Sequence, residues 1–350
     1  MPLPLRKLGA APPSNFPQRA KGCLLGLSVG DAFGTTVKGR RLIAPMFPTL
    51  VDGVHTEMKG RGPHDVRPGQ VTANGQMAAA LALSLRELGR FDAEDVRKRY
   101  LQWLPHAIGP PLCLQEVLGM VPAHQASRIY WVQSSRRAAS NASLVRTAPI
   151  AVLYAKSDDE RLTASFEDSA LTHFDPRCQL ACAAFNYALA ASFQARQPKP
   201  MDVMLAAETG IAIGSARLAR LMPEVVRDTQ DASEMLRRDL EAAQRPDPLL
   251  FGPELHMHQQ EDYVRVAFRL AFWELLHAPS FEAGVLDTVN RGGDSDTNGA
   301  VTGALLGAFY GADAIPARWS VPVLEALGMS RGPLKDLYHP TQMLLLVPST

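Results

Sequence analysis

Hydrophobic positions along the chain recur with the 3.6-residue period of an α-helix, whereas the alternation typical of β-strands is scarce. Residues 77–88 are rich in Ala and Leu and end before Gly89, which predicts a helix with a glycine stop. Asp92 is placed to cap a second helix, which Pro105 ends. The same pattern predicts further helices at residues 176–193, 201–220, 233–244, 262–277, 281–290 and 298–310.

These elements predict an all-α chain with a single helical domain. Residues 1–17 contain five prolines and no continuous apolar run. We therefore expect an N-terminal arm over residues 1–18 and the helical domain over residues 19–350. Long loops are expected at residues 34–69, 104–140 and 245–260.

Composition excludes several classes of protein. The 36 Lys and Arg residues nearly cancel the 35 Asp and Glu residues, so we expect no basic field for nucleic acid. The longest small or apolar stretch, residues 298–312, is too short and too rich in glycine to span a membrane. The four cysteines form no Cys-x-x-Cys pair and are expected to be reduced. A cytoplasmic protein is therefore expected, and no feature of the sequence indicates more than a monomer.

Two predicted helices carry glycines four residues apart. Because each glycine inside a helix costs about 1 kcal/mol relative to Ala, three in register indicate a face where two backbones approach closely. We hypothesise that the two stripes face each other, which would bring Asp31 near the loop at Asp294. The stripes consist of Gly22, Gly26 and Gly30 in the first helix and Gly299, Gly303 and Gly307 in the last.

The segment at residues 291–297, RGGDSDT, carries the clearest chemistry. Gly292 and Gly293 allow the backbone to pass close to a ligand. Asp294, Asp296 and Thr297 offer three hard oxygen ligands of the kind that magnesium and calcium prefer. The two acids can equally serve only to cap the last helix, because Asp is favourable at a helix N-terminus. Spacing alone leaves both interpretations open.

Several segments in the same order resemble the ADP-ribosylglycohydrolase family, which includes the dinitrogenase-reductase-activating glycohydrolases. GGDSDT at residues 292–297 resembles the C-terminal signature of the family, and KGCLLGLSVGDAFG at 21–34 resembles its opening helix. SNASLVRTAP at residues 140–149 resembles a GNGSLMRxxP loop. LTH at 171–173, followed by DP at 175–176, resembles an LTHxDP turn. The resemblance covers most of the chain, from about residue 20 to residue 312.

The resemblance implies an orthogonal bundle of many helices with a binuclear magnesium site in a central cleft. Such enzymes cleave the glycosidic bond between ADP-ribose and a protein side chain or small acceptor. By this resemblance Asp294 and Asp296 are catalytic and, with Thr297, bind metal. His173 contacts the adenosine side, or else is a structural histidine. The resemblance also implies a substrate-binding set made of Ser140, Asn141, Ala142 and Ser143, whose backbone N–H groups would cradle the diphosphate, together with Gly292 and Gly293.

The chain departs from the family at its other metal loop. Where the family reads TDDTQM, residues 72–77 read TANGQM, so one carboxylate is lost at Ala73 and a second becomes Asn74. A further acid of the family falls on Lys38. Two adjacent magnesium ions would be poorly neutralised by the acids that remain. We therefore expect at most one magnesium ion, or none, with Lys38 in place of a metal charge as a binder of phosphate or carboxylate. The candidate ligands of a single ion are Thr72, Asn74, Asp294, Asp296 and Thr297.

Three functions follow from these motifs. The first is a hydrolase of a glycosidic bond of ADP-ribose, or of a related nucleotide sugar, with an altered metal site. The second is an inactive protein that binds ADP-ribose, and the third is a structural family member without a ligand. The position of Lys38 distinguishes them. An ion pair with both Asp294 and Asp296 replaces the metal and disfavours the usual reaction, whereas a solvent-directed Lys38 leaves room for one ion. The acceptor to which ADP-ribose is joined is not indicated by the sequence.

Overall fold

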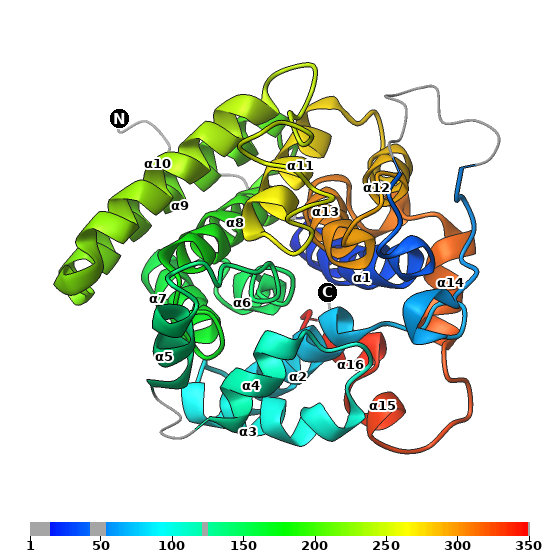
Figure 1. The fold of residues 1–350 in the computed structure, drawn as a ribbon. Coiled ribbons are helices and arrows are strands. Elements are labelled where there is room, and N and C mark those ends of the chain that lie inside the picture. Colours follow the sequence, from blue (N-terminus) through cyan, green and yellow to red (C-terminus); the bar gives the residue numbers. More distant parts are fainter. Residues whose placement is uncertain (1–14, 43–53, 121–124, 349–350) are drawn as a thin grey trace, which may run out of the picture.

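The computed structural model describes residues 15–42, 54–120 and 125–348. Within these ranges the chain folds into helices, and extended pairing is limited to isolated bridges. Two helices, α1 (Phe16–Gly34) and α13 (Ser295–Tyr310), lie side by side in the middle of the molecule, with the other helices arranged around them at varied angles (Figure 1). The predicted all-α, multi-helix bundle is confirmed.

The remaining helices surround this pair on all sides. The helices α8 to α10 form one flank, α11 and α12 cover α13, and α2, α3 and α16 lie together on another side (Figure 1). Their bounds are α2 Ala73–Leu88, α3 Ala93–Trp103, α4 Leu112–Gly119, α5 Ala126–Gln133, α6 Ala148–Leu153, α7 Asp158–Ala170, α8 Pro176–Gln194, α9 Pro200–Leu221, α10 Val226–Ala243, α11 Val264–His277, α12 Phe281–Asn290, α14 Ala317–Glu325, α15 Pro333–Asp336 and α16 Pro340–Leu344.

The predicted helix ends agree with the local chemistry. Asp92 accepts a hydrogen bond from the backbone N–H of Asp95 at the start of α3, and Ser280 does the same for Ala283 at the start of α12. Gly89 ends α2 in the left-handed conformation.

Three sequence-based expectations about loops and helix starts need correction. The loop expected at residues 104–140 contains α4 and α5, and α10 begins seven residues before the predicted start at residue 233. Short helices such as α4 and α5 are stabilised by tertiary packing, which periodicity does not register. Residues 16–18 of the expected arm form the first turn of α1, while residues 1–14 lie outside the described part.

The glycine stripes of α1 and α13 face each other, as hypothesised. A Cβ atom built on Gly26 would lie 2.1 Å from the carbonyl oxygen of Gly303, and one on Gly30 would lie 1.9 Å from that of Gly299. Only glycine permits this backbone contact. It brings the C-terminal end of α1, with Asp31, to the N-terminal end of α13.

Most buried apolar side chains of the described residues belong to one large cluster, and a smaller cluster lies around α2 and α3. The four cysteines are free thiols, three of them buried. In the described ranges, no helix combines the length and the apolar character needed to cross a bilayer.

Gly26→Ala is expected to lower the free energy of unfolding by about 2–3 kcal/mol, because the added methyl group forces α1 and α13 apart. Urea unfolding followed by circular dichroism measures the change. Gly119→Ala is the control, because a Cβ atom at Gly119 in α4 would meet no atom within 4 Å. Equal unfolding midpoints for Gly26→Ala and the wild type would contradict the close approach.

Candidate functional site

The candidate site lies where the end of α1 and the following loop meet the start of α13. Asp294 is the N-cap residue of α13 and Asp296 lies in its first turn. Both side chains are almost completely buried. Ser295 donates a hydrogen bond of 2.7 Å from its hydroxyl to the carbonyl oxygen of Gly34, which ties the two helix ends together. The acids therefore have a fixed position at the base of the helix pair.

Lys38 projects between the two aspartates. Its Nζ donates hydrogen bonds to Oδ1 of Asp294 and to Oδ1 of Asp296. The Lys38 side chain keeps 25% of its exposure, whereas those of Asp294 and Asp296 keep 10% and 2%. The geometry meets the criterion set from the sequence for a lysine in place of a metal charge, the arrangement that was expected to disfavour the usual metal-dependent reaction.

The backbone around Lys38 is clamped to the RGGD loop. The N–H of Gly39 donates to the carbonyl oxygen of Gly293 at 2.7 Å, and the N–H of Gly293 donates to that of Arg40 at 2.8 Å. Gly292 has a positive φ of 76°, and a Cβ atom on it would lie 2.1 Å from the Arg40 carbonyl oxygen. Gly292 and Gly293 were predicted to let the backbone pass close to a ligand. In the structure they let it pass close to the segment that carries Lys38.

Charge and burial oppose each other in this cluster. Burial alone would favour a neutral Lys38, but the carboxylates of Asp294 and Asp296 overcome it and raise the pKa of Lys38. For Asp294 the Lys38 ammonium and the Asn141 hydrogen bond overcome burial and lower the pKa. Burial and the charges of Asp294 and Asp31 raise the pKa of Asp296 to about 7, against the opposing effect of Lys38.

A third acid, Asp31, lies next to this group and anchors the rewritten TANGQM loop. Its side chain accepts hydrogen bonds from the N–H and the hydroxyl of Thr72, at 2.8 and 2.5 Å. It also accepts from the Asn74 side-chain amide at 3.3 Å and from the Gly75 N–H at 3.0 Å. Burial raises the pKa of Asp31, and these hydrogen bonds act against the rise. Asp31 thus holds the start of α2 against α1.

The residues present do not fit a pair of magnesium ions. Lys38 uses one oxygen of each aspartate, and Asn74 turns its amide oxygen to the Thr297 hydroxyl at 3.4 Å. In the described ranges, His, Cys, Asp and Glu side chains form no group of three or more suited to a metal ion. A single magnesium ion on these oxygens stays a prediction, and it requires displacement of the Lys38 ammonium.

The loop at residues 140–143 borders the acids. The side-chain amide of Asn141 donates to Oδ2 of Asp294 at 2.7 Å, and its backbone N–H donates to the carbonyl oxygen of Asp262 at 2.7 Å. Asn141 therefore orients Asp294 and has no free backbone N–H group for a diphosphate. Ala142 lines the cavity above the acids, whereas Ser143 is buried beneath the loop beside Ser169.

His173 lies behind the same loop and contacts Ser140. Nε2 of His173 is 2.7 Å from the Ser140 hydroxyl, and Nδ1 is 2.8 Å from the Thr172 hydroxyl. Burial, with a contribution from the Arg146 charge, lowers the pKa of His173 to about 3. The imidazole is therefore neutral. It donates a hydrogen bond to one of these hydroxyl groups and accepts one from the other.

Two adjoining cavities open over these residues. The Lys38 cavity, of about 300 Å³, is lined by Lys38, Asn141 and both aspartates of α13. The Tyr263 cavity, of about 530 Å³, is lined by Ser140, His173 and Tyr263. Asp262 lines both, so the two cavities adjoin at this residue.

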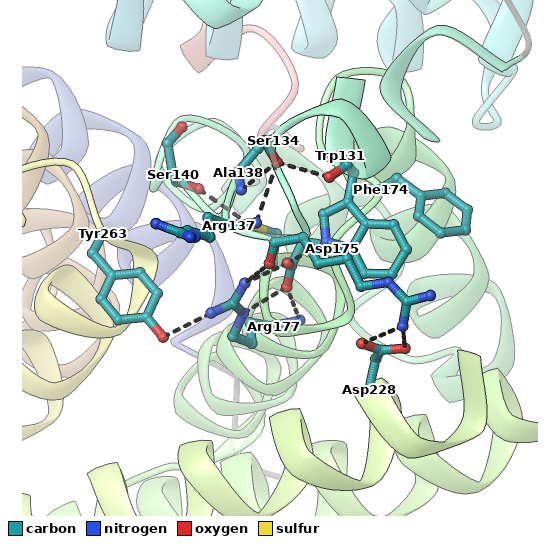
Figure 2. Close-up of polar contacts among 12 residues, drawn as sticks. Trp131, Ser134, Arg137, Ala138, Ser140, Phe174, Asp175, Arg177, Asp228 and Tyr263 are labelled. Carbon is teal, nitrogen blue, oxygen red and sulfur yellow. Dashed lines mark hydrogen bonds and ion pairs between the residues drawn. The ribbon is translucent and has the colours of Figure 1, made fainter. Parts of the chain in front are cut away.

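Three arginines line the Tyr263 cavity, and none of them was among the substrate-binding residues expected from the sequence. Arg177 donates to the Tyr263 hydroxyl at 3.1 Å and pairs with Asp175 (Figure 2). Arg265 pairs with Asp239 and Glu254. Arg137 lies near Ser140 (Figure 2), and no ion pair of its guanidinium is recorded among the described residues. The sequence offered two signals: the adjacent pair Arg136 and Arg137, which can steer phosphate or simply be solvated, and the position of Arg177 directly after the DP pair of the LTHxDP-like turn.

Comparison with known proteins assigns this fold to a class. A solved structure described as an "ADP-ribosylglycohydrolase-related protein complex" matches with a TM-score of 0.65 and 26% identity, covering 95% of this chain and 98% of that one. The ADP-ribosylglycohydrolase family model matches residues 12–343. The chain belongs to the ADP-ribosylglycohydrolase family, as the motifs predicted.

Characterised relatives support the same assignment. The ADP-ribosylarginine hydrolase Tri1 of Serratia proteamaculans is 26% identical over 88% of this chain and 76% of its own length. The ADP-ribosyl-[dinitrogen reductase] glycohydrolase of Rhodospirillum rubrum is 27% identical over 86% of this chain and 88% of its own length. The expectation that the chain is a member of a hydrolase family is confirmed.

A buried pair of carboxyl groups, Glu274 and Asp287, lies next to the RGGD loop at residues 291–294. Glu274 of α11 and Asp287 of α12 are both fully buried. Asp287 pairs with Arg291, which begins the loop, and Glu274 accepts from the Thr288 hydroxyl. Burial and the Asp287 charge raise the pKa of Glu274 well above its ordinary value. Glu274 therefore holds its proton more tightly than a solvent-exposed carboxyl group does.

This pair predicts a loss of stability at alkaline pH. Because the folded state holds the Glu274 proton more tightly than the unfolded state, its contribution is complete below the unfolded pKa, near 4.5, and falls as the pH rises towards the folded value. Glu274→Gln mimics the protonated form and is expected to flatten this fall, seen as a smaller difference in thermal midpoint between pH 6 and pH 9. A wild-type slope equal to that of Glu274→Gln would contradict a raised pKa of Glu274.

Proposed function

We propose that the chain binds the ADP-ribosyl part of its substrate along the two adjoining cavities and hydrolyses its glycosidic bond above Asp294 and Asp296. One observation carries the proposal. The Lys38 cavity is lined by four carboxyl groups, those of Glu261, Asp262, Asp294 and Asp296, against the single ammonium of Lys38. The buried carboxyl group of Asp31 adds its charge next to Asp296. The substrate class is an ADP-ribosylated protein or a small molecule that carries ADP-ribose.

The chemistry of glycoside cleavage fits this charge. When the bond from the anomeric carbon to its acceptor breaks, positive charge develops on the ribose ring. Buried carboxylates stabilise that charge more strongly than solvent does, because they are already oriented towards it. Water adds to the anomeric carbon, and the acceptor leaves with one of the water protons.

The Tyr263 cavity supplies the remaining contacts in this proposal. A diphosphate carries negative charge, and arginine guanidinium groups bind phosphate in a planar, two-pronged manner. Arg177 and Arg265 already have carboxylate partners, whereas Arg137 is available to a ligand. The rings of Tyr130, Phe174 and Tyr263 offer stacking surfaces for adenine.

A second function, binding of ADP-ribose without cleavage, is favoured by the position of Lys38. Its ammonium neutralises part of the acidic charge and holds one oxygen from each aspartate of α13. If this contact persists with substrate bound, neither oxygen is free to accept a proton from water. The two functions share the ligand and differ in turnover.

Asp296→Asn is expected to reduce ADP-ribose release at least 100-fold, since it removes a buried charge at the reacting end without changing its volume. The assay separates released ADP-ribose by chromatography after incubation with ADP-ribosylated arginine, serine peptides and small acceptors. Asp65→Asn is the control, because Asp65 lies on an exposed loop with 77% of its side chain accessible. Equal rates of ADP-ribose release for Asp296→Asn and wild type would contradict the role of Asp296 in cleavage. If the wild-type protein binds ADP-ribose but releases none from these substrates, the second function is supported.

Arg137→Ala is expected to weaken ADP-ribose binding about 10-fold, because it removes a charge-assisted hydrogen bond to phosphate. Calorimetric titration measures the dissociation constant. Arg136→Ala is a matched control, since Arg136 is adjacent in sequence but pairs with Asp228 outside the Tyr263 cavity. Equal effects of the two variants would show that Arg137 acts only through general charge.

A further inference from the structure

We infer that Lys38 is a built-in cation that takes the place of the divalent metal ions of this cleft, so that ligand binding here needs no metal. The inference has a second part. The oxygens that Lys38 occupies form a divalent-cation site that is blocked in the wild type and becomes available when the ammonium is removed.

The first support is the geometry of the ammonium. Nζ donates to Oδ1 of both Asp294 and Asp296, the two acids that stand at the N-terminal end of α13. Two carboxylate oxygens directed at one point form the kind of environment in which a hard cation is bound. The ammonium occupies that point with one positive charge.

The second support is that the protein holds this lysine in position. The residue after it, Gly39, donates its N–H to the carbonyl oxygen of Gly293 at 2.7 Å. The neighbouring bridge between Arg41 and Gly292 continues the contact. Asn141 fixes the other carboxylate oxygen of Asp294. A surface lysine paired by chance would have neither the backbone clamp nor partners that are oriented in this way.

The third support is the loss of negative charge in the TANGQM loop, residues 72–77. The TANGQM loop offers Asn74 where a carboxylate would help to neutralise a metal pair, and Asn74 uses its amide oxygen on Thr297. Asp31, which lies in α1 next to this loop, is held by Thr72, Asn74 and Gly75. One ammonium suits the acids that are left better than two divalent ions do.

Lys38 also has a donor left for a ligand. An ammonium carries three N–H groups, and two of them point at the aspartates. The side chain is 25% exposed and lines the Lys38 cavity. The third N–H is therefore available to a hydroxyl or phosphate oxygen of a nucleotide sugar. This last step rests on the proposed function, whereas the cation site does not.

The decisive experiment needs only the metal and the protein. Thermal unfolding of the wild type, Lys38→Met and Lys38→Gln is followed in EDTA and in millimolar MgCl₂, MnCl₂ or CaCl₂. The wild-type midpoint is expected to be unchanged. Both variants are expected to unfold at a lower temperature in EDTA and to gain on the order of 3 °C or more with at least one of the cations. Lys156→Met, at an exposed lysine outside the cleft, is the matched control.

Each outcome bears on the inference. Asp294→Asn added to Lys38→Met is expected to abolish the gain, which assigns it to these oxygens. Folded Lys38 variants that show no cation-dependent shift would overturn the inference. A wild-type midpoint that rises with a cation, together with calorimetric binding of Mn²⁺, would overturn it also, and this measurement does not depend on whether any variant folds.

A ligand titration separates this inference from the proposed function. Wild-type protein is expected to bind ADP-ribose with the same dissociation constant in EDTA and in MgCl₂, and Lys38→Met to bind about 10-fold more weakly in EDTA. Tighter wild-type binding with magnesium would contradict the inference. Absence of ADP-ribose binding in both buffers, together with the expected cation response of the variants, would contradict the proposed function but still support the cation site.

Discussion

Helices α1 and α13 touch backbone to backbone because glycines occupy the facing turns of both. This contact brings together two segments that are distant in the sequence, since α1 and α13 are separated by some 260 residues. The end of α1 carries Asp31, the loop after it carries Lys38, and the start of α13 carries Asp294 and Asp296. A larger side chain in either stripe would separate the groups that form the cleft, so the small residues are as necessary to the site as the charged ones.

The site is a balance between burial and charge. Burial raises the pKa of Asp31 and Asp296, and their mutual repulsion adds to the effect on Asp296. Lys38 and the hydrogen-bond donors of the surrounding loops act against this rise in pKa. Removing one partner from such a cluster leaves an uncompensated charge, which is costly in a buried site. Family membership and local chemistry therefore support different conclusions. Family membership predicts glycoside hydrolysis. The local chemistry shows an altered charge arrangement, in which a lysine lies between the acids.

The cleft has two walls of different structure. The acidic wall, on α1 and α13, belongs to the rigid helix pair. The other wall is made by loops around Ser140 and Tyr263, which an isolated bridge holds together. Asn141 joins the walls because its side chain contacts Asp294 and its backbone contacts Asp262. A ligand that spans both cavities would touch both walls, so changes in the loops can alter specificity without moving the acids.

The sequence by itself determined the all-α class, most long helices, the glycine stripes and the family, because these depend on periodicity and on short motifs within one segment. It also placed Asp294, Asp296 and Lys38 among the candidate residues. It did not determine that Asn141 would orient Asp294, that Gly292 and Gly293 would face the Lys38 segment, or that α4 and α5 would form. Only the tertiary structure decided these points, and above all the direction of the Lys38 side chain. That direction depends on backbone hydrogen bonds that join Gly39 and Arg40 to Gly293, which is far from them in the chain and which no local pattern connects to them.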